Sequence, residues 1–311
     1  MRFKSAASSN LEAAIMHKPV LLDEVLQYLA PRDGETYIDA TFGAGGYSTA
    51  ILRAANCNVI GIDQDPLAAE IASKVTGNFK FIAGNFGNLA ELVSEKVDGI
   101  VFDIGVSSMQ IDTAERGFSF MKDGPLDMRM SQSGMSAADF LNDADEEEIA
   151  DVIYKYGEEK NSRRIAKSII ASRPLTTTMQ LAEAVHKVSK YDGKTDSATK
   201  TFQALRIFIN RELEVLEQGL EAALNLLKAG GRLVVVTFHS LEDRIVKTFI
   251  KDHSDPKQKF NKYARNEDEK KSNSALEIIT RKAIMPSENE LKSNPRARSA
   301  KLRSAIKSGG N

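Results

Sequence analysis

The sequence predicts an α/β protein with a mostly parallel, Rossmann-like sheet and a small all-helical domain inserted into it. Three observations support this prediction. Short β-branched segments alternate with helical segments in the first hundred residues, a stretch without strand pattern follows residue 134, and an apolar strand pattern returns at residue 232. An interrupted βαβ rhythm is typical of one sheet that contains an inserted domain.

Four strands are expected before the interruption, at residues 37–41, 58–63, 79–83 and 97–103. Each segment is rich in β-branched or aromatic residues, and helical segments of about a dozen residues separate them. Repeated βαβ units predict parallel strands with right-handed crossovers.

The inserted domain is expected to be helical. A loop rich in Gly, Asp and Met follows the fourth strand, and Ser136 with Asp139 then resembles a capping box that opens a helix. Apolar residues recur at helical spacing between residues 149 and 188. The expected organisation is a disordered extension at 1–16, a core at 17–134 and 198–311, and the helical insertion at 135–197.

A single long helix is expected next, because apolar residues from 202 to 227 form one stripe at helical spacing. Ala229-Gly230-Gly231 is expected to end this helix, and residues 232–238 predict a buried parallel strand. The charged segment 257–271 indicates a solvated loop. Residues 276–284 and 299–306 are expected to pair as a final hairpin.

The composition excludes several classes of protein. The 311 residues include one cysteine, Cys57, which excludes internal disulfides and cysteine-based metal cages, and no metal site is expected. No apolar run approaches the roughly 20 residues that span a bilayer, so we expect no membrane partner. A lone thiol and the lack of an apolar leader fit a cytoplasmic protein. The 42 Lys and Arg balance 43 Asp and Glu, so a basic binding face requires local clustering.

The first expected strand leads into a glycine-rich turn, residues 39–46. Glycines let a ligand approach the backbone, and the helix that follows offers unpaired N–H groups, although a plain strand-to-helix turn has the same pattern. Asp63, about 20 residues after the glycines, places a carboxylate where a ribose diol binds. Because Asp65-Pro66 offers a cap for the next helix, we expect Asp63 to be freer to bind a ligand.

The fourth expected strand ends at Asp103. Open α/β sheets bind ligands beyond the carboxyl ends of their strands, so Asp39, Asp63 and Asp103 are expected to converge on one crevice. NAD enzymes share the glycine turn and the second-strand acid, but a dinucleotide site more often shows a second phosphate-binding element. This sequence shows none, which favours an adenosyl cofactor.

Eight segments match, in order, the motifs of one family. They lie at residues 17–25, 39–43, 103–108, 116–120, 123–130, 201–206, 238–247 and 294–299. With them the chain resembles the bacterial ribosomal RNA small-subunit methyltransferase H family, formerly called MraW, over nearly its whole length from about residue 17 to 305. Three positions depart from the family pattern: Tyr47, where His is common, and Asn85 and Met109, where relatives often carry Pro.

The resemblance implies a class I methyltransferase with S-adenosylmethionine as its cofactor and an inserted helical substrate-recognition domain. It also implies methylation of the exocyclic N4 of a cytidine in the decoding region of 16S ribosomal RNA, with the small ribosomal subunit as partner. Carried over by position, the cofactor contacts fall on Gly45, Gly46, Tyr47, Asp63, Phe86, Asp103 and Gln110.

The chemistry of that reaction points to two catalytic candidates. The cytosine N4 lone pair is delocalised into the ring, so catalysis needs an acceptor that polarises the N–H bond. We expect Asp103 to orient the cofactor or the amine rather than act as a full base. His239 ends the last parallel strand, where a contact to the RNA or the amine competes with a structural hydrogen bond to its own loop. The run 242–244 fits a solvated helix start.

RNA contacts are expected in both parts of the chain. Phe118 and Phe120 either stack on a splayed-out cytosine or fill the join between core and insertion. Basic residues, candidates for phosphate contacts, cluster at Arg163, Arg164 and Lys167 and again at Lys292, Arg296, Arg298, Lys301 and Arg303.

Three other functions fit part of the pattern. An NAD-dependent enzyme on the same fold would bind NAD rather than S-adenosylmethionine in equilibrium dialysis. A non-catalytic ribosome-assembly factor that keeps the cofactor pocket would fail in single-turnover methyl transfer. A methyltransferase for DNA or protein is disfavoured by the extent of the motif match.

Overall fold

The computed structural model describes residues 19–189, 196–254 and 274–309. The expected extension at 1–16 and the charged segment 257–271 lie outside these ranges. Two compact units make up the chain. Of the described residues, the sheet unit contains 19–105 and those from Leu213 onward, and the helical unit contains those within Val106–Glu212.

The sheet unit is built on seven strands in the order β3-β2-β1-β4-β5-β7-β6. Their bounds are β1 Thr36–Asp39, β2 Asn58–Asp63, β3 Phe79–Ala83, β4 Val97–Asp103, β5 Leu227–Thr237, β6 Leu276–Ile278 and β7 Lys301–Lys307. The first five in this order pair in parallel, whereas β7 is antiparallel to β5 and to β6. The mostly parallel Rossmann-like sheet is confirmed, and the final hairpin extends it.

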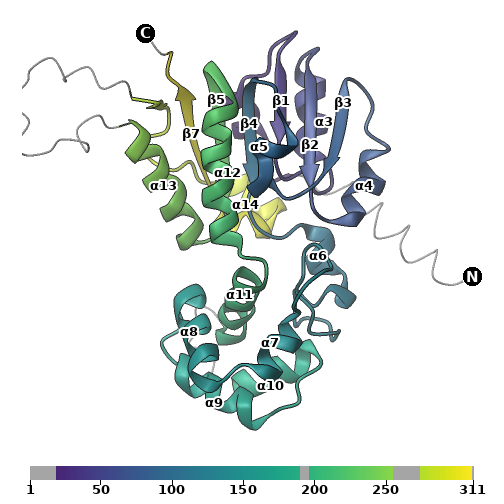
Figure 1. Ribbon diagram of the computed structural model, residues 1–311, viewed down its shortest axis with the longest axis vertical. Coiled ribbons are helices and arrows are strands. Elements are labelled where there is room, and N and C mark those ends of the chain that lie inside the picture. The colour runs from purple at the N-terminus through teal and green to yellow at the C-terminus, as the bar shows by residue number, and fades with distance from the viewer. Residues whose placement is uncertain (1–18, 190–195, 255–273, 310–311) are drawn as a thin grey trace, which may run out of the picture. The chain divides into compact units, whose positions relative to one another are not determined.

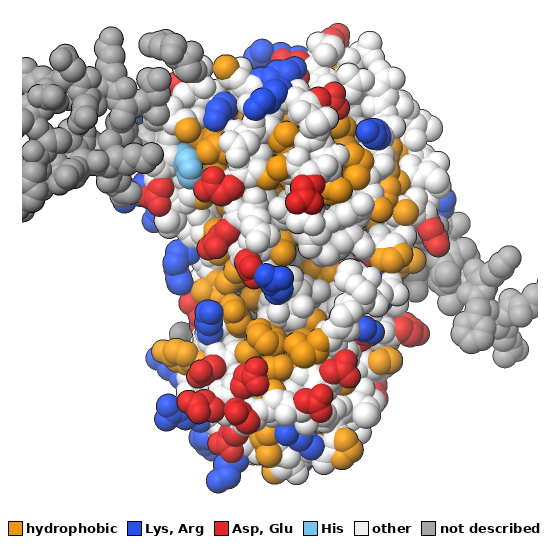
Figure 2. Space-filling model, in the orientation of Figure 1, with side chains coloured by type: hydrophobic (Ala, Val, Ile, Leu, Met, Phe, Trp, Pro, Cys, Tyr) orange, Lys and Arg blue, Asp and Glu red, His pale blue; other side chains and the backbone are white. Residues whose placement is uncertain are grey.

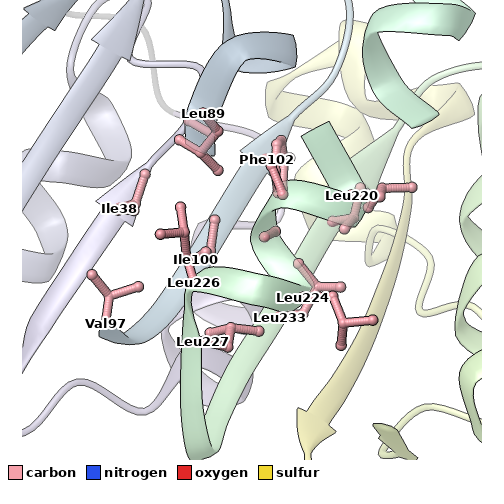
Figure 3. Close-up of a cluster of buried hydrophobic side chains, with 14 of the residues drawn as sticks. Ile38, Leu89, Val97, Ile100, Phe102, Leu220, Leu224, Leu226, Leu227 and Leu233 are labelled. Carbon is pink, nitrogen blue, oxygen red and sulfur yellow. The ribbon is translucent and has the colours of Figure 1, made fainter. Parts of the chain in front are cut away.

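Helices cover both faces of this sheet (Figure 1). They are α2 Leu22–Leu29, α3 Gly46–Ala54, α4 Pro66–Ala72, α5 Leu89–Leu92, α12 Glu212–Leu226, α13 Ser240–Ser254 and α14 Glu288–Ser293, with 3-10 turns η1 Phe86–Asn88 and η5 Pro295–Ser299. Alternate strand residues face opposite sides: Ile100 and Leu233 join the core under α12, and Val101 and Val234 join the core under α2 and α3. Figure 3 shows the first of these cores, with Leu220 of α12 packed toward Phe102 of β4.

The helical unit contains α6 Ser108–Asp112, η2 Ala114–Arg116, α7 Ala137–Asp143, α8 Glu146–Gly157, α9 Ser162–Ala171, α10 Thr178–His186 and α11 Ser197–Ile209. Ser136 and Asp139 form the expected capping box of α7. The unit is wider than the predicted insertion at 135–197, because the preceding loop folds onto the helices. Leu126 and Met128 are buried in their core, and Asn210 Nδ2 donates to the Met128 carbonyl at 2.8 Å.

The prediction of one long helix after residue 198 is wrong. The chain turns between α11 and α12, where Arg211 has φ 51° and Asn210 hydrogen-bonds the preceding turn and the loop at Met128. Phe202 therefore packs in the helical unit's core and Leu220 in the sheet unit's core. The glycines at 230 and 231 lie within the irregular start of β5 rather than after a helix end.

Among the helices that the structure describes, none is long and apolar enough to cross a membrane.

Candidate active site

The glycine-rich turn joins β1 to α3 at the carboxyl edge of the sheet. The Phe42 N–H donates to the Ile62 carbonyl at 2.9 Å, and the Gly43 N–H donates to Asp63 Oδ2 at 2.7 Å, so the turn is tied to β2. Gly45 has φ 76°, and a Cβ atom there would lie 2.8 Å from the Phe42 ring. Only glycine satisfies both constraints, and the Gly45 N–H donates to the Phe42 carbonyl at 2.7 Å, which closes the turn.

The next two residues of the turn are packed against the segment before α2. A Cβ atom at Gly46 would lie 2.2 Å from Pro19 Cγ. The Tyr47 side chain is buried, and its hydroxyl donates to the Val20 carbonyl. Tyr47 therefore offers a ligand its backbone rather than its ring.

Asp39 is a buried anchor for this turn. Its Oδ2 accepts hydrogen bonds from the Ser48 N–H at 3.1 Å and from Ser48 Oγ at 2.7 Å. The residue is 1% exposed. Burial raises the pKa of Asp39 to about 6, although the Ser48 hydrogen bonds act in the opposite direction. Asp39 thus holds β1 and the start of α3 together.

Asp63 is less free than the sequence indicated. Its Oδ2 accepts from Gly43, and its Oδ1 accepts from the Asp65 N–H at 2.8 Å, while Asp65 itself caps α4 as expected. Burial raises the pKa of Asp63 to about 6. A carboxylate has about four acceptor positions, so these two bonds leave capacity for a ribose hydroxyl.

Asp103 combines burial with an unpartnered oxygen. Its backbone N–H donates to Thr41 Oγ1 at 2.6 Å, which fixes the end of β4 against the turn. Among the described residues, its Oδ1 has no hydrogen-bond partner and is shielded from solvent. Burial, together with the charges of Asp39 and Glu242, raises the pKa of Asp103 to about 8. A buried carboxyl group with a raised pKa, at the edge of the sheet where ligands bind, is a strong candidate for a role in binding or catalysis.

His239 and Glu242 form a reciprocal cap at the start of α13. Glu242 Oε2 accepts from the Phe238 N–H at 2.7 Å and the His239 N–H at 3.3 Å, and His239 Nδ1 accepts from the Glu242 N–H at 3.4 Å. His239 Nε2 also lies 2.8 Å from Glu242 Oε1. Glu242 is 0% exposed, so the expectation of a solvated helix start is wrong. The backbone N–H groups at the helix start explain how this buried carboxylate is accommodated.

Phe86 begins η1, the turn that follows β3. Its ring meets the Phe102 ring edge-on at 5.5 Å between centroids. A Cβ atom at Gly219 would lie 2.7 Å from Phe86 Cδ2, so α12 supports the ring from one side. The half-buried ring remains a predicted cofactor contact.

Three of the predicted residues belong to the helical unit. The Gln110 side chain accepts from the Ser107 N–H at 3.0 Å in the capping box of α6. Phe120 packs on Phe202 at 5.1 Å between centroids, and the Arg116 guanidinium lies 5.7 Å from the centre of the Phe118 ring. Both half-buried phenylalanines thus pack on the helical core, and their roles toward a ligand stay predictions.

The predicted basic residues differ in how exposed they are. Arg163 and Arg164 are exposed on α9, and Arg296 and Arg298 are exposed in η5. Arg303 and Lys301 instead contact Asp243, at 2.7 Å and 3.3 Å. Their prediction as phosphate contacts is therefore weakened, because Asp243 offsets one of their two positive charges. Figure 2 shows acidic and basic side chains interspersed on the visible face of the helical unit.

Sequence reasoning missed the residues that support the site. Thr41 and Ser48 hold Asp103 and Asp39, and Glu242 holds the end of β5. Only Glu242 gave a recognisable pattern, a Glu at the third position of a helix. Asp103 Oδ1 fits a ligand with a positive charge, because it is a buried acceptor that no donor among the described residues uses.

Comparisons with known sequences identify the family of this chain. The model of the MraW methylase family matches residues 14–308. The chain is 56% identical to the ribosomal RNA small subunit methyltransferase H of Rickettsia prowazekii and 53% identical to that of Rickettsia bellii, each over 94% of this chain and 98% of the relative. An rRNA methylase structure from Streptococcus thermophilus gives a TM-score of 0.42 at 12% identity, covering 94% of this chain and 99% of that one.

Proposed function

Because the chain belongs to the MraW methylase family, we propose that it methylates the exocyclic N4 of a cytidine in the decoding region of 16S ribosomal RNA. Its methyl donor is S-adenosylmethionine, the cofactor of this methylase family. The observation that carries the proposal is Asp103, whose buried Oδ1 lies at the carboxyl edge of the sheet without a hydrogen-bond partner among the described residues. The motifs shared with the family and the names of the relatives support the RNA target.

Binding of the donor rests on residues of the sheet unit. The backbone at Gly45 and Gly46 and the carboxylates of Asp63 and Asp103 would hold it, with the Phe86 ring beside η1. Bound there, the donor supplies an electrophilic methyl group. Gln110 completes the predicted set of contacts from α6.

Asp103 is proposed to orient the amine. The N4 nitrogen carries two protons, and one of them must leave after the methyl group has been transferred. An acceptor aligned on N–H raises the electron density on nitrogen and fixes its direction of attack. Asp103 Oδ1 has this acceptor capacity because no protein donor among the described residues uses it. His239 is tied to Glu242, so it is better suited to shape the loop than to move a proton.

The helical unit and the C-terminal segment are proposed to hold the RNA. The exposed side chains of Arg163, Arg164, Arg296 and Arg298 offer charges for phosphates. Phe118 and Phe120 are proposed to offer ring faces on which an unstacked base can stack. We place the reaction in the cytoplasm, on the small ribosomal subunit or its RNA.

Nucleoside mass spectrometry tests the proposal. Small subunits and 16S RNA that lack the modification are incubated with the protein and S-adenosylmethionine, digested and searched for N4-methylcytidine. The product is expected with the native chain and absent with Asp103→Ala. Absence of N4-methylcytidine from both substrates with the native chain contradicts the proposal.

A further inference from the structure

Three carboxyl groups, those of Asp39, Asp103 and Glu242, lie near one another at the carboxyl edge of the sheet. Asp39 ends β1, and Asp103 ends the neighbouring β4 with its N–H on Thr41 Oγ1. Glu242 accepts a hydrogen bond from the Phe238 N–H. Phe238 lies two residues beyond Val236, the residue of β5 that pairs with Asp103. Asp39 and Glu242 are fully buried, and Asp103 is partly exposed as a residue although its Oδ1 is shielded.

No lysine or arginine among the described residues forms an ion pair with Asp39 or Asp103. The other titratable groups packed at this edge of the sheet unit are Asp63, Tyr47 and His239. Asp63 adds a further negative charge, the Tyr47 hydroxyl donates to the Val20 carbonyl, and His239 lies against Glu242. Among the described residues, the negative charge of Asp39 and Asp103 is therefore not balanced by a lysine or arginine.

The hydrogen bonds decide which carboxyl holds a proton. Asp39 accepts from the N–H groups of Thr41 and Ser48 and from the Ser48 hydroxyl, and Glu242 accepts from two backbone N–H groups. Asp103 Oδ1 accepts from no described residue. Neighbouring buried carboxyls do not all ionise, and the one with the fewest donors retains the proton. The pKa of Asp103, raised to about 8, is accordingly higher than that of Asp39, raised to about 6.

We propose that Asp103 carries a proton in the free protein, releases it when the sulfonium methyl donor binds and keeps it when the uncharged thioether product binds. The O–H bond of the carboxyl breaks and its proton goes to solvent, while the sulfonium supplies the compensating positive charge. Asp103 is then the residue that discriminates between the positively charged donor and the uncharged thioether of the product. The inference rests on the cofactor and is independent of which nucleotide receives the methyl group.

Calorimetry measures the proton directly. S-adenosylmethionine, S-adenosylhomocysteine and the ammonium-bearing analogue sinefungin are each titrated into the full chain at pH 7, in two buffers with different ionisation enthalpies. All three ligands carry the same α-amino group, so its contribution cancels in the comparison. Binding of one molecule of donor or sinefungin is expected to release close to one proton more than binding of one molecule of product. Equal proton counts for donor and product overturn the proposal.

Two variants assign the proton to one side chain. Asp103→Asn is expected to abolish the difference between donor and product. Asp98→Asn removes a carboxylate from the opposite end of the same strand, where Asp98 pairs with Lys228, and is expected to retain the difference. A difference that persists in a folded Asp103→Asn protein overturns the assignment.

Infrared spectroscopy tests the native chain if Asp103→Asn does not fold. The carbonyl stretch of a protonated carboxyl is expected to disappear on adding the donor and to remain on adding the product. The ratio of donor affinity to product affinity should also rise up to about tenfold per pH unit below pH 8 and level off above it. A ratio that stays constant from pH 6 to 9 contradicts the proposal. These measurements need no RNA. A result that contradicts the protonation of Asp103 is therefore distinct from a result that contradicts the proposed RNA target.

Discussion

Carboxylates of the helical unit and carboxylates at the carboxyl edge of the sheet unit have pKa values shifted in opposite directions. In the helical unit, Asp127 contacts Arg129 at 2.6 Å, and Glu159 contacts Lys200 at 3.3 Å. Hydrogen bonds and these cations hold the pKa of both groups below its usual range. At the carboxyl edge of the sheet unit, burial instead raises the pKa of Asp39, Asp63 and Asp103.

The difference does not arise from a lack of basic residues in the sheet unit. Asp243, on α13, is paired with Arg303 and Lys301, and its pKa is lowered like those of the helical unit. Carboxylates paired with a cation stabilise the fold in their ionised form, whereas burial without such a cation disfavours the ionised form of those at the edge. Charge left uncompensated at one edge of a sheet is a mark of a binding site.

The largest expected effect comes from Asp103→Asn, which should separate stability from function. Turnover should fall at least about a hundredfold, because the amide keeps the shape but loses the charge and acceptor capacity of one oxygen. The raised pKa of Asp103 means that its contribution to stability is present below its ordinary value and is lost as the pH rises through about 8. The melting temperature of the free variant above pH 8 should therefore exceed that of the native chain.

Single-turnover methyl transfer and thermal unfolding at pH 5 and 9 check this prediction. A variant that loses stability at both pH values, or that retains native turnover, would show that Asp103 belongs with the structural carboxylates.

The second effect concerns the glycine turn. Gly45 and Gly34 have similar backbone angles, φ 76° and 78°, but only Gly45 lies against a ring, that of Phe42. Gly34→Ala should cost about 1 kcal/mol from backbone strain alone. Gly45→Ala adds a steric clash and should weaken donor binding at least about tenfold. Calorimetric titration with S-adenosylmethionine measures this, and equal affinities for the two variants would remove the turn from the site.

A third prediction addresses the helical unit. Glu159 is 5% exposed in its side chain and accepts from the Asn161 N–H and from Ser197 Oγ. Glu159→Gln should lower the free energy of unfolding by about 1–2 kcal/mol at pH 7. Because the pKa of Glu159 is lowered, its stabilisation exists above the ordinary value of 4.5 and is lost as the pH falls, so the deficit should shrink in acid.

Denaturant unfolding at pH 7 and pH 4 measures that deficit. The exposed Asp151→Asn on α8 serves as the control and should change stability by less than about 0.5 kcal/mol. A deficit for Glu159→Gln that grows in acid would contradict the contrast between the units.

The smallest effect is expected from the basic surface of α9. Arg163→Gln with Arg164→Gln should leave stability unchanged and weaken RNA binding severalfold, with the salt dependence of binding reduced by up to about two counterions. Filter binding over a series of salt concentrations measures this. The exposed pair Arg281→Gln and Lys282→Gln is the matched control. The same change in salt dependence for both pairs would show that α9 has no special role.

The sequence by itself determined the parts of this protein that depend on local pattern. The strands at 58–63, 79–83 and 97–103 were predicted with the bounds found, because β-branched runs between turns have few alternatives. The glycine turn, the Asp65 cap and the Ser136 capping box were equally readable, since each is a contact between near neighbours in the chain. Family motifs added the identity of the cofactor.

Only the tertiary structure decided what depends on distant contacts. The break at Arg211 separates two helices whose apolar stripe is continuous in sequence, because each half packs in a different core. The burial of Glu242 and the pairing of Arg303 with Asp243 join residues that no periodicity links. The protonation of Asp103 depends on donors that other strands provide or withhold, and a linear pattern contains no record of them.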